Sequence, residues 1–220
     1  GYIGKQFSDF LIKLKIKHVC IVRPNKKIKS STYKKIIFFD IEKEKDLNVN
    51  FLEKDVLIHL AWSSLDNYFN KDHSQKYPKI HFDFIRSLIK KNLKNILITG
   101  TCLEYGIKTG KVKEKSICKP NTEYGRGKNK LLLKLNKLNK KIKFNLIWLR
   151  LFYIYSDNPK LNTILSELNK KTKKNKFFTI NKPYECRDFI DIKKIIKIIF
   201  RLSKIKRNFG VVNLGSGKPQ

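Results

Sequence analysis

Short apolar runs that alternate with amphipathic segments constrain the fold of this chain more than any other feature. The runs occupy residues 18–22, 36–39, 56–61, 96–98, 144–149 and 211–214. Between and around them, apolar side chains recur at helical spacing in residues 7–14, 80–91, 131–138, 161–168 and 192–202. Buried strands separated by amphipathic helices are typical of βαβ units. The pattern therefore predicts an α/β fold with a doubly wound parallel sheet.

The length of the chain, 220 residues, is enough for one sizeable core with a smaller attached part. Because the regular alternation loosens beyond Arg150, we expect a main domain in residues 1–150 and a smaller region in residues 151–220 that is interleaved with the same sheet. The chain starts at Gly1 within what reads as the middle of a motif. We therefore expect both termini to be truncated, with the missing first strand belonging at the centre of the sheet.

Lysine dominates the charged residues and gives the chain a formal charge of +32. Such a charge ordinarily suggests a nucleic-acid partner. Here the lysines are spread along the whole length, and isoleucine, asparagine and phenylalanine are also abundant, as A/T-rich codons would produce. A nucleic-acid interface needs clustered basic residues and stacking platforms, so we disfavour nucleic acid as the partner. A basic, non-catalytic protein that binds RNA or another polyanion remains the alternative from a different class.

The sequence shows neither a membrane-spanning pattern nor a metal-binding pattern. No apolar run approaches the ~20 residues that are needed to cross a bilayer. The four cysteines show no CxxC spacing and no histidines at zinc-site intervals; they are Cys20, Cys102, Cys118 and Cys186. We expect reduced thiols, no metal, no membrane partner and a cytoplasmic location.

Tyr124 and Lys128 form the candidate chemical centre. They lie four residues apart, so a helix places both side chains on one face. A phenol has a pKa near ~10 and exchanges protons at neutral pH only beside a cation, which Lys128 can supply. Thr101 follows an apolar run, so we expect its hydroxyl at the carboxyl end of a strand, where α/β sheets bind ligands. The alternative, in so lysine-rich a chain, is an exposed helical contact between the tyrosine and the lysine.

Two glycines at the start of the chain suggest a dinucleotide-binding turn. Gly1 and Gly4 match the last two glycines of a GxxGxxG motif, in which the backbone approaches a pyrophosphate on a helix N-terminus. The alternative is a plain junction between a loop and a helix.

The first and second apolar runs are each followed by a charged residue that suits an adenosine group. Asp40 can accept a hydrogen bond from the adenine amino group while Ile41 packs on the ring; the alternative for Asp40 is a helix N-cap. Arg23 follows the run at residues 18–22, where an acidic residue would bind the ribose hydroxyls of NAD. An arginine there favours the 2′-phosphate of NADP, and its alternative is a solvated turn.

The run at residues 56–61 contains His59, which we interpret as a hydrogen-bonded core histidine rather than a ligand. Leu60, Ala61 and Trp62 end this run and either line a cofactor cavity or belong to the ordinary core. Arg187 can bind phosphates with both guanidinium nitrogens, or it forms a surface ion pair with Asp188 or Asp191.

Eight segments together resemble the extended short-chain dehydrogenases/reductases, the family of nucleotide-sugar epimerases, dehydratases and reductases. They occur in the family's order and at its spacing, and they cover nearly the whole chain: GYIG, FFDIE, DVLIHLAW, TGTCLEYG, KPNTEYGRGK, LRLFYIY, RDFIDI and VVNLGSG.

The resemblance implies an NAD(P)-binding Rossmann domain in residues 1–150 and a nucleotide-diphosphate sugar bound in the cleft to residues 151–220. It implies that Tyr124 exchanges a proton with the sugar, that Lys128 holds the nicotinamide ribose and lowers the pKa of Tyr124, and that Thr101 bonds the reacting oxygen. It adds Thr99, Leu151 and Phe152 to the cofactor site, and it places Cys102, Tyr153 and Arg187 at the substrate, with Arg187 on the diphosphate. Family members are often dimers, so a homodimer is possible by analogy.

Departures from the family pattern narrow the expected reaction. Sugar 4,6-dehydratases carry Asp-Glu directly after the threonine, and here those positions hold Cys102 and Leu103. Dehydration is therefore disfavoured. The segments TGTCLEYG and RLFYIY are most similar in sequence to those of reductases of 4-keto-6-deoxy nucleotide sugars. A C4 epimerase that recycles its own NAD needs the same three catalytic residues and remains the alternative.

Overall fold

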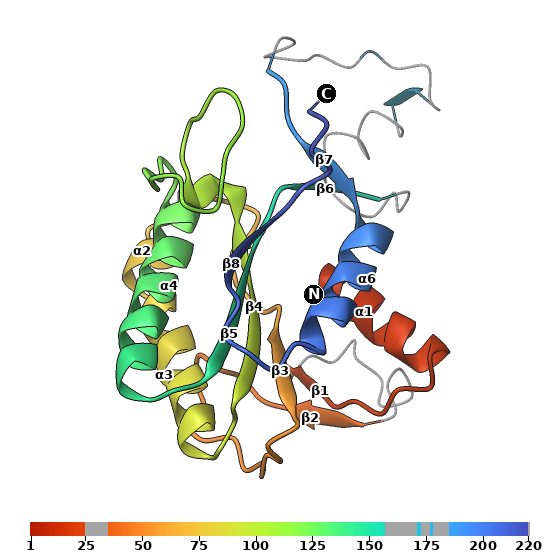
Figure 1. Ribbon diagram of the computed structural model, residues 1–220, viewed down its shortest axis with the longest axis vertical. Coiled ribbons are helices and arrows are strands. Elements are labelled where there is room, and N and C mark those ends of the chain that lie inside the picture. The colour runs from red at the N-terminus through yellow and green to blue at the C-terminus, as the bar shows by residue number, and fades with distance from the viewer. Residues whose placement is uncertain (25–34, 157–170, 173–176, 178–184, 220) are drawn as a thin grey trace.

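The computed structural model describes residues 1–24, 35–156, 171–172, 177 and 185–219 (Figure 1). Its main sheet has four parallel strands in the order β3-β4-β5-β8: β3 is Val56–His59, β4 is Asn95–Thr101, β5 is Asn145–Leu151 and β8 is Gly210–Leu214. Two further parallel pairs form separate sheets. One contains β1 (Cys20–Val22) and β2 (Ile36–Phe38), and the other contains β6 (Tyr153–Tyr155) and β7 (Phe189–Asp191).

Helices cover both faces of the main sheet, as Figure 1 shows. One face carries α2 (Asp72–Gln75), α3 (Tyr77–Lys90) and α4 (Glu123–Lys141). The other face carries α1 (Tyr2–Lys13) and α6 (Ile192–Ser203). A short 3₁₀ helix, η2 (Cys102–Glu104), follows β4 directly. This arrangement confirms the predicted α/β fold with a doubly wound parallel sheet.

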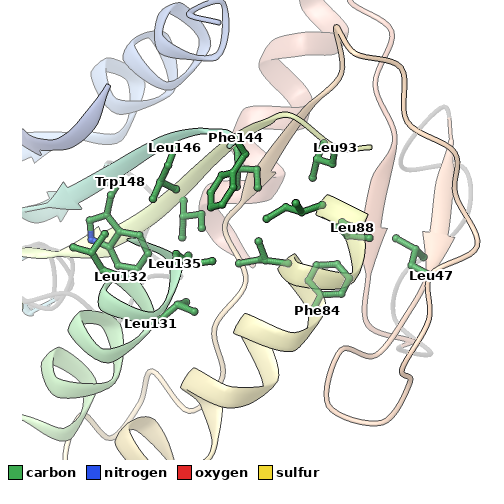
Figure 2. Packing of buried hydrophobic residues seen from close by; sticks show 14 of the residues in the cluster. Leu47, Phe84, Leu88, Leu93, Leu131, Leu132, Leu135, Phe144, Leu146 and Trp148 are labelled. Atoms are coloured by element: carbon green, nitrogen blue, oxygen red, sulfur yellow. The ribbon is translucent and has the colours of Figure 1, made fainter. Parts of the chain in front are cut away.

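The core consists of two apolar clusters, one on each side of the sheet. Neighbouring residues of β4 point to opposite clusters, because side chains alternate along a strand. Ile96 and Ile98 pack with α3 and α4, whereas Leu97 packs with α1 and α6. Figure 2 shows the first cluster, in which Leu131 and Leu135 of α4 meet Trp148 of β5. Every residue of β4 is buried, which explains the uninterrupted apolar run in the sequence.

The helix that bears Tyr124 has strong local start and stop signals. Thr122 is its N-cap, and the threonine hydroxyl accepts a hydrogen bond from the Gly125 amide at 3.1 Å. Glu123 lies in the first turn and two lysines lie in the last, so both ends complement the helix dipole. The sequence therefore determines where α4 begins, and with it the position of Tyr124.

Several predicted element boundaries differ from the structure. The run at residues 56–61 was expected to be a strand to its end, but β3 stops at His59 because its pairing with β4 ends at Ile98. Leu60, Ala61 and Trp62 therefore belong to the loop after β3. The helix predicted for residues 80–91 begins earlier, at Tyr77. The helix predicted for residues 161–168 lies outside the described residues. Among the helices that the structure describes, none is long and apolar enough to cross a membrane.

Candidate active site

The carboxyl ends of three adjacent strands lie side by side at one edge of the sheet. In the register of the sheet, Thr101 of β4 is paired with Leu151 of β5, and Leu151 is paired with Leu214 of β8. Parallel α/β sheets bind their ligands at this edge. The register therefore brings the predicted residues Thr101 and Leu151 to the same place.

Thr101 is held by a reciprocal cap at the start of η2. Its hydroxyl accepts a hydrogen bond from the Leu103 amide at 3.3 Å, and its own amide donates to Glu104 Oε1 at 2.9 Å. This capping box fixes the N-terminal end of the short helix. The backbone of Thr101 is therefore fixed without any ligand.

Glu104 forms a buried ion pair with Arg150, which lies in the neighbouring strand β5. Arg150 Nε is 2.8 Å from Glu104 Oε2, and the two side chains are only 3% and 0% exposed, respectively. Trp148 Nε1 also donates to this carboxylate, at 2.9 Å. Burial raises the pKa of Glu104, and the Arg150 guanidinium opposes that shift. The pair ties η2 to β5 directly beneath Thr101.

The same network holds the loop that follows η2. Arg150 lies 4.3 Å from the Tyr105 ring centroid and donates to the Glu114 carbonyl oxygen at 3.2 Å. Tyr105 Oη donates to Asn213 Oδ1 at 2.7 Å, and Asn213 Nδ2 donates to the Val112 carbonyl oxygen at 3.1 Å. Strands β5 and β8 thus fix the loop over the candidate site.

Two glycines let neighbouring backbone approach α4 on either side of the Tyr124–Lys128 face. A Cβ atom on Gly125 would lie 2.4 Å from the Leu103 carbonyl oxygen in η2. A Cβ atom on Gly127 would lie 1.8 Å from the His73 carbonyl oxygen in α2. Larger residues would push both segments away. The glycines of YGRGK therefore let η2 and α2 pack directly against the helix.

Lys128 is buried, with 1% of its surface exposed, and it points toward β4 and Trp62. Its Nζ donates to the Thr99 carbonyl oxygen at 2.7 Å and lies 4.1 Å from the centroid of the Trp62 ring. Burial lowers the pKa of Lys128 to about 7, although the negative charge of Glu104 opposes this. The predicted alternative of an exposed tyrosine–lysine contact is therefore wrong.

The phenol of Tyr124 lies in an aromatic enclosure. Tyr68 stacks on it with ring centroids 5.0 Å apart, and the rings of Trp62 and His73 approach at steep angles. Lys128 Nζ lies 5.9 Å from the Tyr124 ring centroid. Burial raises the pKa of Tyr124, which is opposite in direction to the lowering that the family resemblance implies. Loss of hydration raises the pKa of Tyr124 by more than a cation 5.9 Å from the ring centroid can lower it.

The residues predicted for the adenosine group gather at the ends of β1, β2 and β3. Arg23 Nε lies 3.4 Å from Asp40 Oδ1, and its Nη2 forms an ion pair with Glu42. Glu42 also accepts hydrogen bonds from Ser63 and Lys76. Asp40 Oδ1 accepts from the Glu42 amide at 3.0 Å within a turn; no helix follows, so the N-cap alternative is not observed. Arg23 is therefore paired with carboxylates, and its side chain remains 51% exposed, as the solvated alternative expects.

The other predicted cofactor residues surround the start of α1. Gly1 is the N-cap, and Gly4 faces Leu60, whose Cδ1 would lie 4.0 Å from an added Cβ. Tyr2 Oη is hydrogen-bonded to Ser156 at 2.5 Å, and Ile3 packs against the α1–α6 cluster. The first turn of α1 has no acidic residue, so its positive end suits a phosphate. The predicted residues Ile41 and Ala61 flank the adenosine corner, with Ile41 packed on the core and Ala61 exposed.

The predicted substrate residues lie on the C-terminal side of the same edge. The Arg187 guanidinium lies 4.6 Å from the centroid of the Tyr153 ring. The ion-pair partner of Arg187 is Glu185, at 2.9 Å. The alternative of an ion pair with Asp188 or Asp191 is not observed. Asp188 instead accepts hydrogen bonds from the Ser216 and Gly217 amides. Burial raises the pKa of Cys102 to about 11, which keeps it a thiol. Phe152 follows β5, and its amide donates to the Leu214 carbonyl oxygen.

His59 is confirmed as a hydrogen-bonded core residue, because its Nε2 lies 2.8 Å from His81 Nδ1. Sequence reasoning missed Tyr68, His73, Glu104 and Arg150. Arg150 carried a usable signal, since a charge within the apolar run NLIWLRL needs a buried partner. Tyr68 and His73 lie in a polar loop and a short helix, and nothing in their spacing marks them.

A model of the NAD-dependent epimerase/dehydratase family matches residues 1–215. The chain belongs to this family. It is 30% identical, over 229 aligned residues, to dTDP-6-deoxy-L-talose 4-dehydrogenase (NAD(+)) from Aggregatibacter actinomycetemcomitans, and the match covers 100% of this chain and 83% of that protein. The resemblance to the extended short-chain dehydrogenases/reductases is thereby confirmed.

Solved structures of the family share this fold. UDP-glucose 4-epimerase from Thermotoga maritima superimposes with a TM-score of 0.81 at 16% identity, covering 100% of this chain and 75% of that chain. UDP-glucuronic acid 4-epimerase from Bacillus cereus, solved with UDP-glucuronic acid and NAD, gives a TM-score of 0.79 at 22% identity over 100% and 76% of the two chains. The family match identifies the chain as an enzyme of the NAD-dependent epimerase/dehydratase family, and these structures show that it shares their fold.

Proposed function

We propose that this protein interconverts the 4-keto and 4-hydroxyl forms of a 6-deoxy nucleotide sugar, and that it works chiefly as a reductase. The observation that carries the proposal is the common position of Thr101, Tyr124 and Lys128 at one sheet edge, within a family that acts on nucleotide sugars. The relative named for 4-dehydrogenase activity on a 6-deoxy sugar supports this choice of reaction.

Each of the three residues has a distinct part in the proposed reaction. NADH, when bound, supplies a hydride to the sugar carbonyl carbon. Tyr124 donates its phenolic proton to the carbonyl oxygen, and Thr101 gives that oxygen a second hydrogen bond. Lys128, once turned toward the ligand, supplies the positive charge that makes proton exchange by the phenol easier. Cys102 stays a neutral thiol and Leu103 is apolar, so this edge offers no acid pair for the elimination of water.

For the cofactor we propose NAD(H) rather than NADP(H). The arginine that favours a 2′-phosphate is paired with Glu42 and lies near Asp40. Arg23 and Lys76 are therefore balanced by two carboxylates, and a phosphate dianion would have to displace or repel them. Ribose hydroxyls, in contrast, can donate to Glu42.

A spectrophotometric assay tests the proposal. A 4-keto-6-deoxy dTDP sugar is mixed with the enzyme and either NADH or NADPH, and absorbance of the reduced cofactor is followed. We expect stoichiometric loss of NADH, slower loss of NADPH, and a fall in kcat of about 10²–10⁴-fold for Tyr124→Phe. Unchanged turnover in Tyr124→Phe would contradict the role of the phenol.

Two other outcomes would replace the proposal. Conversion of a nucleotide sugar to its C4 epimer, with tightly held NAD and no net loss of NADH, would identify an epimerase. Neither turnover nor cofactor binding, together with salt-sensitive binding of RNA, would identify a basic polyanion-binding protein.

A further inference from the structure

Trp62 and His73 are joined by a hydrogen bond beside the proposed catalytic lysine. Trp62 Nε1 donates to His73 Nδ1 at 2.9 Å. His73 Nε2 lies 3.0 Å from the carbonyl oxygens of Ser64 and Asn67, so this nitrogen carries the proton and Nδ1 is left to accept. His73 is fully buried. One histidine thus connects the indole to the loop that follows β3.

Stacking fixes the plane of the same indole. His81 lies on Trp62 with ring centroids 4.4 Å apart and planes 10° apart, and His73 is stacked at 6.4 Å and 8°. The face of the indole then lies 4.1 Å from Lys128 Nζ. An aromatic face attracts a cation. The attraction is strongest for the indole of tryptophan and for a cation that is removed from water.

We propose that Trp62, oriented by His73, is a positioning residue that stabilises the protonated form of Lys128 and directs its ammonium. The inference rests on the proposed role of Lys128 and extends it to two residues outside the catalytic trio. The backbone carbonyl of His73 also lies against Gly127, where the absence of a side chain lets α2 pack close to the lysine-bearing helix.

Other titratable groups that face Lys128 either favour its protonated form or are neutral near pH 7. Glu104 from η2 favours its protonated form. His59 from β3 and His81 from α3 have pKa values lowered by burial, to about 3 for His59, so both are neutral near pH 7. Tyr124 on α4 itself has a raised pKa and is also neutral there. Among the described residues, Trp62, Glu104 and the Thr99 carbonyl oxygen are therefore the neighbours that favour the charged form of Lys128.

The test is a titration of Lys128 by NMR in ligand-free protein labelled with ¹³Cε-lysine. The Lys128 signal is assigned by its loss in Lys128→Met. Trp62→Leu removes the aromatic face, and we expect the titration midpoint to fall by about half to one pH unit. His73→Phe keeps a ring in the stack but removes the acceptor for the indole, and we expect a smaller fall in the same direction.

Tyr77→Phe is the matched control. It removes the hydrogen bond between Tyr77 Oη and Ser64 Oγ, 2.8 Å long, from the same loop but leaves the indole face intact. We expect no change in the Lys128 midpoint. A purely structural role for Trp62 would lower the melting temperature and leave the midpoint where it is.

An unchanged midpoint in Trp62→Leu, or an equal shift in Tyr77→Phe, would overturn the inference. If Trp62→Leu does not give a native melting transition, His73→Phe decides alone, and an unchanged midpoint there overturns it. The titration needs neither cofactor nor substrate. A failure to consume NADH would therefore contradict the proposed function while leaving the titration result readable.

Discussion

Charged side chains are buried in one corner of the molecule, at strand ends of the main sheet, and exposed in another, at the ends of the β1–β2 sheet. At the ends of β4 and β5, Glu104, Arg150 and Lys128 are at most 3% exposed, and each has partners in neighbouring elements. At the ends of β1 and β2, Arg23 is 51% exposed and meets its carboxylates in solvent. Charges in the first corner are strongly coupled to folding, whereas those in the second are screened by water. The residues beside the proposed catalytic lysine are thus part of the core. The proposed cofactor preference depends instead on charged side chains at the surface.

The largest expected effect comes from breaking the buried ion pair. Glu104→Gln keeps the shape of the side chain but leaves the Arg150 charge unpaired, which should lower the free energy of unfolding by about 3–5 kcal/mol. Urea denaturation measures this. Glu123→Gln, which removes an exposed pair with Arg126 on the first turn of α4, should cost less than about 0.5 kcal/mol. Equal losses in the two variants would contradict the contrast between the corners.

The next effect concerns the close approach of α2 to the catalytic helix. Gly127→Ala places a methyl group against the His73 carbonyl oxygen, so we expect a loss of about 3 kcal/mol. Gly4→Ala in α1 meets only a distant side-chain atom and should raise stability by about 0.5–1 kcal/mol, as alanine favours a helix. Thermal melts of both variants without cofactor separate the two cases. Stabilisation by Gly127→Ala would show that α2 does not pack as described.

Lys128→Met should increase stability while abolishing turnover. The native pKa of Lys128 is lowered to about 7, so below pH 7 the folded protein carries the full cost of a buried charge. Between pH 7 and about 10 the unfolded chain binds the proton and the folded chain does not, so wild-type stability rises with pH. We expect a gain of about 2 kcal/mol for the Met variant at pH 6, after loss of the Thr99 and Trp62 contacts, and a smaller gain at pH 9. Denaturation at both pH values checks the sign.

The smallest effect on the free energy of unfolding is expected for Arg23, at the site predicted for the adenosine group. Arg23→Ala should lower the free energy of unfolding by less than about 1 kcal/mol, because its partners are reached through solvent. The loss should shrink further in 1 M salt, where the Debye length is about 3 Å. Lys79→Ala, which removes an exposed pair with Asp83, gives a reference value for a surface interaction. A loss above about 2 kcal/mol would place Arg23 with the buried charges instead.

Much of the fold follows from local pattern in the sequence. The apolar runs identified each strand of the main sheet, and the four-residue spacing of Tyr124 and Lys128 predicted one shared helix face. Boundaries were less certain: β3 stops at His59 because its partner strand sets the pairing, and that information lies 40 residues away in the chain.

The site was only partly accessible from sequence. Residues in motifs, such as Thr101 and Tyr124, were found because spacing and position carry a chemical meaning. His73 was not found, because its role depends on an indole eleven residues earlier and on a helix packed across it. The partners of Arg23 were also missed, since Glu42 and Ser63 meet it only after three strand ends have been brought together.

The loop over the site is secured by a bond between distant parts of the chain, since Tyr105 and Asn213 are 108 positions apart. During synthesis, β4, β5 and the proposed catalytic helix are all made before the strand that carries Asn213. A nascent polypeptide therefore holds this loop by earlier contacts, such as those of Arg150 and Arg126, until residue 213 has left the ribosome. A chain stalled before β8 would carry all three proposed catalytic residues but would lack the Tyr105–Asn213 bond that fastens this loop.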